Sequence, residues 1–144
     1  MDGSDFIALA GRLAAAPQAN EATYRTAVSR AYYGAFHLAR SFLTELGFQP
    51  VGNANVHAFV QRYLNGSGYT EACLAALQLT HLQSGRNRAD YDLDDSEVGL
   101  RQYAMVSVER AHRVASALDI CRGGEARESI RQAIADYEQR IRPR

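Results

Sequence analysis

The chain has 144 residues, of which 47% are hydrophobic and 22% charged, as in ordinary globular proteins. This composition excludes a disordered chain, and the length favours one domain over residues 1–144. The 16 basic residues, all arginine, balance 16 acidic ones, which excludes the broad positive field of a non-specific DNA-binding protein.

Cysteine content and hydropathy exclude further classes of protein. Two cysteines, Cys73 and Cys121, are too few for a disulfide framework or a cysteine-rich zinc site. The acidic N-terminus has no cationic start of a secretory signal, and no stretch approaches the roughly 20 apolar residues of a membrane span. We expect a cytoplasmic protein that has no membrane association.

Helical periodicity with matching cap residues runs along the whole chain. Ser4 or Asp5 is expected to cap the first helix, Asn20 the second, and Asn53 or Asn55 a short third helix. The predicted helices cover about residues 4–16, 20–46, 53 or 55–64, 70–91, 96–122 and 125–142. No segment shows strand alternation, so the sequence predicts an all-α antiparallel bundle of four to five main helices plus a short helix.

The second helix is expected to be central because its apolar stripe is wide on both sides of Ala35. Gly34 on this helix allows another backbone to approach closely. Six apolar residues are predicted to be buried where helices cross: Ala31, Ala35, Phe42, Leu77, Ala111 and Leu118.

A polar row follows the same helix at a spacing of three or four residues. Its members are Arg25, Ser29, Tyr33, His37, Arg40 and Thr44, with Arg30 beside them. The row is either a solvated face or a polar groove or subunit interface, because arginine and tyrosine are enriched at interface hot spots.

A second polar cluster lies near the end of the fourth predicted helix, at residues 86–91. Arg86 and Asp90 are four residues apart and can pair, which gives a salt-bridged helix end as one interpretation. The other is a phosphate site, because an arginine can hold two phosphate oxygens at once. Tyr91 could donate a hydrogen bond there, but a phenol of pKa near ~10 is a poor base.

Other chemistry lacks a sequence pattern. There is no glycine-rich phosphate loop, and no Ser-His-Asp arrangement is indicated. Glu109 and His112 form a single Glu-x-x-His pair, whereas a di-iron bundle needs two. His57, on the short helix, fits a surface or core position. We expect neither a metal nor a cofactor.

Two blocks resemble the small bacterial and archaeal branch of the HEPN-domain family (higher eukaryotes and prokaryotes nucleotide-binding). They are residues 24–40, with Ser-Arg-Ala-Tyr-Tyr and Phe-His, and residues 86–91, with Arg-x-x-Ala-Asp-Tyr. His57 and Phe59 also fit, so that the resemblance covers roughly residues 20–120. It implies a helical bundle that forms a homodimer, and the predicted homodimer buries part of the polar row or the segment around Arg86.

Many HEPN domains are metal-independent ribonucleases, and others are toxins paired with a small nucleotidyltransferase antitoxin or accessory modules of defence systems. The ribonuclease motif is an arginine, often followed by Asn, Asp or His, with four to six residues between the arginine and a histidine. Arg86 and Asn87 match its start, but Tyr91, Asp92 and Leu93 occupy the histidine positions.

The resemblance thus implies an accessory or toxin-like component of a toxin–antitoxin or defence system that binds RNA or a nucleotide. The alternatives are a metal-independent ribonuclease with Tyr91 at the histidine position, or a non-catalytic partner of a nucleotidyltransferase. Arg86 and Tyr91 are expected to line a cleft that Arg30, Tyr33 or His37 faces. The candidate catalytic residues are Arg86, Asn87 and Tyr91, and the candidate binding residues are Arg30, Tyr33, His37, Arg88 and Asp90.

Overall fold

The computed structural model describes residues 1–52 and 55–142. These residues form six α-helices and one short 3₁₀ helix, and they contain no strand. The elements are α1 (Gly3–Ala15), α2 (Glu21–Glu45), α3 (Val56–Gly66), α4 (Thr70–Tyr91), η1 (Glu97–Gly99), α5 (Arg101–Cys121) and α6 (Gly124–Ile141). The all-α bundle is therefore confirmed.

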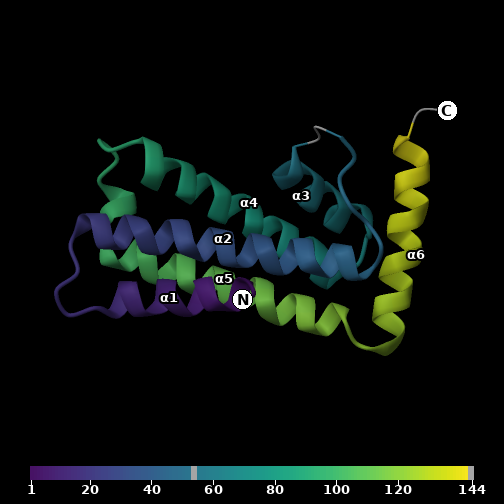
Figure 1. The fold of residues 1–144 in the computed structure, drawn as a ribbon, viewed down its shortest axis with the longest axis horizontal. Coiled ribbons are helices and arrows are strands. Elements are labelled where there is room, and N and C mark those ends of the chain that lie inside the picture. The colour runs from purple at the N-terminus through teal and green to yellow at the C-terminus, as the bar shows by residue number, and fades with distance from the viewer. Residues whose placement is uncertain (53–54, 143–144) are drawn as a thin grey trace.

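Helix α2 is the centre of the bundle and contacts α1, α3, α4 and α5 (Figure 1). Helices α1, α2 and α5 run along the long axis of the molecule, and α4 is inclined beside them. Helix α6 stands steeply across one end of the bundle and packs mainly on α3 and α5. None of the helices in residues 1–52 and 55–142 has the length and apolar character of a bilayer crossing.

Small residues bring the backbones of α1 and α2 together. A Cβ added at Gly34 would lie 2.7 Å from the backbone oxygen of Gly3, and one added at Gly3 would meet the backbone oxygen of Gly34. The close approach expected at Gly34 is thus confirmed, and it fixes how α1 lies on the central helix.

The helix boundaries follow their caps. Asn20 caps α2 and Asn55 caps α3, as expected, while the alternative cap Asn53 lies outside the described residues. For α1 the cap is Asp2, not Ser4 or Asp5, because the Asp2 carboxylate accepts the backbone N–H of Ser4 and Asp5 completes a capping box.

The fifth main helix begins later than predicted. Residues 97–99 form the 3₁₀ turn η1, and α5 starts only at Arg101. Val98 and Gly99 are buried, and a Cβ at Gly99 would meet the side chain of Glu21 at the start of α2. This packing against α2 holds the segment in a tight turn ahead of the helix.

Five of the six predicted core residues are fully buried: Ala31, Ala35, Phe42, Ala111 and Leu118. The prediction for Leu77 is wrong, because this side chain is 51% exposed. The buried residues of α4 are instead Ala72, Ala75, Ala76, Leu79, Leu82, Gly85 and Ala89. Leu77 is two residues from Leu79, which places it on the opposite side of the helix.

Candidate functional site

The first residue of the predicted polar row, Arg25, is 7% exposed and lies inside the fold. Its guanidinium pairs with Glu21 at 2.9 Å and donates to backbone carbonyls at the end of α4 and in the following loop. The accepting carbonyls are those of Arg88, Ala89, Asp92, Leu93 and Asp95. Arg25 therefore satisfies the free carbonyls at a helix C-terminus and acts as a structural cap.

The remaining residues of the row become more exposed along α2. Ser29 is buried, Tyr33 and His37 are half-buried, and Arg40 and Thr44 are exposed. The row is thus neither a uniformly solvated face nor one continuous groove, because its first two members are covered by the chain itself.

Arg88, a predicted binding residue, is held in internal ion pairs on the η1 side of α4. Its Nε lies 2.6 Å from Asp95 and its Nη2 3.1 Å from Glu97, and its guanidinium carbon is 5.5 Å from the ring centre of Tyr103. The hydrogen bond from Arg88 holds the pKa of the Asp95 carboxyl below its usual value. Arg88 is therefore engaged in fixing the loop after α4.

Arg86 lies on the opposite side of α4, against aromatic rings. Its guanidinium carbon is 5.2 Å from the ring centre of Tyr33, 5.6 Å from Tyr32 and 5.9 Å from Tyr91. Its Nε is buried and has no hydrogen-bond partner among residues 1–52 and 55–142. The side chain is a cation that rests on π-faces.

The pair expected between Arg86 and Asp90 does not form. Asp90 instead accepts a hydrogen bond from the hydroxyl of Ser29 at 3.2 Å. No ion pair within the described part of the chain includes Arg86. Arg86 therefore retains its donors for an anion, in contrast to Arg25 and Arg88.

Arg30 approaches the same aromatic group from α2. Its guanidinium carbon lies 4.9 Å from the ring centre of Tyr33 and 5.3 Å from that of Phe6, and its Nη2 donates to Ser29 at 3.3 Å. Tyr33 is thus in contact with two arginines, Arg30 and Arg86. Two cations on one ring make an electropositive surface with an aromatic centre.

His57 joins this group from α3. Its Nδ1 forms a hydrogen bond with the hydroxyl of Tyr32, and its ring stacks on Phe36 with 4.4 Å between ring centres. Burial, and then the nearby charge of Arg86, lower the pKa of His57 below the usual 6.5. At neutral pH the imidazole is therefore neutral. Burial also raises the pKa of the Tyr32 hydroxyl.

Two other predicted residues lie at the margin of this group. His37 stacks on Phe6 with 5.9 Å between ring centres, and burial followed by the charge of Arg40 lowers its pKa. Asn87 is exposed, next to Arg86 in the sequence. We use the name Arg86 cluster for the residues that meet around the guanidinium: Arg30, Tyr32, Tyr33, His57, Arg86 and Tyr91.

The sequence predicts four of these six residues as site candidates: Arg30, Tyr33, Arg86 and Tyr91. It does not predict Tyr32 or a role for His57. Tyr32 lies within the block at residues 24–40, and its side chain is 1% exposed yet contacts both Arg86 and His57. No spacing rule connects positions 32, 57 and 86, because they come from three different helices.

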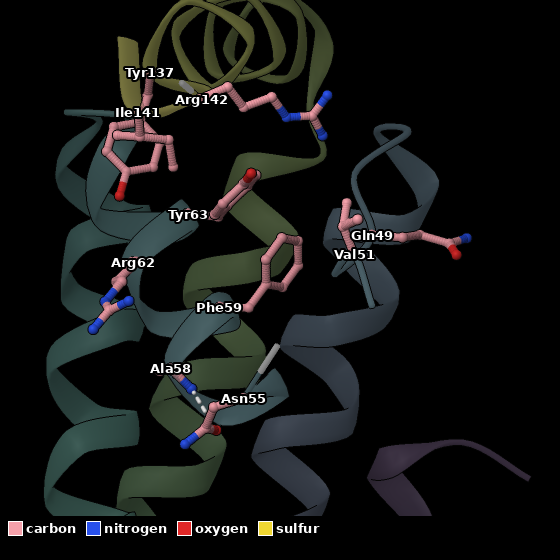
Figure 2. A pocket seen from close by; sticks show the side chains of 10 residues that line it. All are labelled: Gln49, Val51, Asn55, Ala58, Phe59, Arg62, Tyr63, Tyr137, Ile141 and Arg142. Carbon is pink, nitrogen blue, oxygen red and sulfur yellow. Dashed lines mark hydrogen bonds between the residues drawn. The ribbon is translucent and has the colours of Figure 1, made fainter. Parts of the chain in front are cut away.

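Five pockets lie away from the Arg86 cluster. One of about 350 Å³ lies between α3, the segment before it and the end of α6, on a floor of aromatic rings (Figure 2). There the Tyr63 hydroxyl donates to Glu138 at 2.9 Å, and burial followed by this carboxylate raises the pKa of Tyr63 to about 12. None of these five pockets is lined by Arg86 or Tyr91.

Residues 1–52 and 55–142 contain no group of three or more His, Cys, Asp or Glu side chains arranged to hold a metal ion. Comparison with family models, with curated proteins and with solved structures gave no match to this chain.

Proposed function

We propose that the Arg86 cluster binds the phosphate and base of RNA or of a nucleotide. In this proposal the chain is a HEPN-like accessory or toxin-like component of a bacterial toxin–antitoxin or defence system. The observation that carries the proposal is Arg86 itself, a guanidinium that rests on three tyrosine rings and has no acidic partner among the described residues.

The roles of the individual residues in this proposal follow from their exposure and charge. Arg86 and Arg30 supply positive charge for a phosphate, since guanidinium groups bind phosphate oxygens in pairs. Tyr91 is 78% exposed and 5.9 Å from the Arg86 guanidinium, so its ring is free to stack with a base. A stacking platform beside a cation is typical of single-stranded nucleic-acid binding.

A second candidate function, a metal-independent ribonuclease with an altered motif, is favoured by His57. This imidazole is beside Arg86 and is neutral at neutral pH, which is the form that a general base needs. The cluster thus has a histidine from α3, although the motif position on α4 holds Tyr91. A non-catalytic role as partner of a nucleotidyltransferase uses the same arginine and tyrosine surface as a protein contact.

Binding of a labelled single-stranded oligoribonucleotide, followed by fluorescence anisotropy, tests the proposal. Arg86→Ala should weaken binding by about 1–3 kcal/mol, as expected for hydrogen bonds to a charged group. Arg12→Ala is the matched control, because Arg12 is an exposed arginine on α1 outside the cluster. Equal binding by wild type, Arg86→Ala and Arg12→Ala would contradict the proposal.

Incubation of the same oligoribonucleotide with a metal chelator separates binding from cleavage. Cleavage that requires both Arg86 and His57 favours the ribonuclease, and intact RNA bound through Arg86 favours the accessory role. If the protein neither cleaves nor binds the RNA, the neighbouring genes should be inspected next, since a nucleotidyltransferase encoded alongside favours the protein-partner role.

A further inference from the structure

The outer face of α5 and the adjoining side of α4 expose large apolar side chains. Met105 is 52% exposed, Val106 45% and Ile120 53%, and on α4 Leu74 and Leu77 are 45% and 51% exposed. Helices α4 and α5 pack side by side, and Leu74 and Ile120 line one groove of about 370 Å³ between them. Large apolar side chains gathered on the exposed faces of neighbouring helices are typical of an interaction site.

The charges on this face have a symmetric order. Glu109 and Arg113 lie at the middle of α5 with 3.5 Å between Nε and Oε1, and their side chains are 63% and 62% exposed. Apolar residues flank them on both sides, with Met105 and Val106 toward the start of the helix and Ile120 toward its end. An acid just before the midpoint and a base just after it are complementary to the same pattern running in the opposite direction.

We propose that a second copy of this chain covers this face, with the two α5 helices antiparallel about a twofold axis between Glu109 and Arg113. In that arrangement a residue before the midpoint faces the residue at an equal distance after it. Glu109 then faces the partner's Arg113, and by symmetry the same ion pair forms twice. Neither Glu109 nor Arg113 then faces its own counterpart.

In the same register, a projecting side chain of one copy lies opposite the groove between α4 and α5 of the other copy. Val106 is five residues before the midpoint, and Ser116, which lines the groove between α4 and α5, is five residues after it. Val106 of one copy therefore lies over the groove of the other, close to Leu74 and Ile120 on its walls. Such knob-and-groove packing is how helices of a bundle associate.

The surface is long enough for a stable contact. Helix α5 has 21 residues, and at about 1.5 Å per residue it spans roughly 30 Å. A specific dimer buries at least about 1,000 Å² in total, which a helix of this length with its α4 neighbour can supply. None of these residues belongs to the Arg86 cluster. This dimer is therefore independent of the proposed function, and it does not use the polar row of α2, whose first two members are buried.

Charge exchange tests the antiparallel register directly. The mass in solution of wild type, Glu109→Arg, Arg113→Glu and the double variant is measured by light scattering over a concentration series. Each single change brings like charges together across the twofold axis and should weaken the dimer by at least about tenfold. The double variant restores opposite charges and should recover the dimer.

Val106→Glu tests the apolar contact, and Leu93→Glu is its control, because Leu93 is 74% exposed in the loop after α4 and lies outside this face. Val106→Glu should yield monomers, whereas Leu93→Glu should remain dimeric. Circular dichroism verifies that each variant is folded, and Met105→Glu replaces Val106→Glu if the latter is not. The proposal would be overturned if the wild type is a monomer at every concentration, or if the dimer tolerates glutamate at both position 105 and position 106. It would also be overturned if the double charge variant dimerises no more tightly than the single variants.

Discussion

The guanidinium of Arg25, on α2, donates a hydrogen bond to the backbone carbonyl of Asp95, 70 residues later in the chain. The side chain of Asp95 forms an ion pair with Arg88 on α4. The loop after α4 is thus held by one arginine through its backbone and by another through its carboxylate. Both arginines fix the end of the helix that carries Arg86 and Tyr91.

We predict that Arg25→Ala destabilises the protein by at least about 3 kcal/mol, because it leaves buried carbonyl groups without donors. Arg25→Lys should recover little of this loss, since an ammonium cannot reproduce the planar fork of donors. Urea unfolding followed by circular dichroism measures both variants. Arg40→Ala, at an exposed position of the same helix, should change stability by less than about 0.5 kcal/mol. A similarly small effect for Arg25→Ala would contradict a structural role.

Phe42 is fully buried on α2, below the guanidinium of Arg122 at 5.5 Å from its ring centre. Phe42→Ala should therefore cost about 3–5 kcal/mol of unfolding free energy, through lost burial and the cavity that remains. The measurement is the urea midpoint, with Leu93→Ala as the exposed control. A loss of less than about 1 kcal/mol would place Phe42 outside the core.

The lowered pKa values of His57 and His37 predict how stability depends on pH. Both imidazoles take up a proton less readily in the folded than in the unfolded chain. Their contribution is complete above the unfolded pKa of 6.5 and is lost as pH falls below it toward the folded values. Urea unfolding at a series of pH values across this range should show falling stability toward the acid side.

His57→Gln should reduce that slope. Glutamine keeps a polar group near the Tyr32 hydroxyl and removes the titration. A slope that is identical in wild type and His57→Gln would show that His57 titrates alike in both states.

Tyr91→His restores the histidine of the ribonuclease motif five residues after Arg86. If the scaffold is a ribonuclease with an altered motif, this variant should cleave single-stranded RNA faster than wild type in the presence of a metal chelator. Adding Arg86→Ala to it should remove the gain, and Asp94→His is the control for an exposed histidine nearby, because position 94 lies outside the histidine positions 91–93. Equal cleavage by Tyr91→His and Asp94→His would argue for binding alone.

Local signals predicted most of the helix boundaries. Asn20 and Asn55 cap their helices through side-chain contacts to backbone N–H groups two or three residues ahead, which a single sequence can reveal. Gly47, which the sequence placed after the second helix, adopts a φ of 97° there. The exposure of Leu77 was missed because α4 has apolar residues on several sides, so its pattern does not define one face.

The candidate site was predictable only in part, because its contacts are long-range. Arg25, Arg86 and Arg88 look alike in the sequence, yet their acceptors and rings lie on other helices and loops. Only the fold shows that two of these arginines are occupied by carbonyls and carboxylates. The residue type indicated phosphate chemistry, and tertiary packing decides which arginine remains open to it.

The steep position of α6 links the C-terminus of the chain to the Arg86 cluster. Helix α6 buries only Ile130 and Ile134 fully, and it packs on α3 through Tyr137, whose ring is next to Gly66. An element with so little buried surface opens at lower free energy than the bundle. Because α3 carries His57, an opening of α6 loosens the support of the one histidine that bonds Tyr32. An opening of the last helix would thereby reach the hydrogen bond between His57 and Tyr32 from the far end of the molecule.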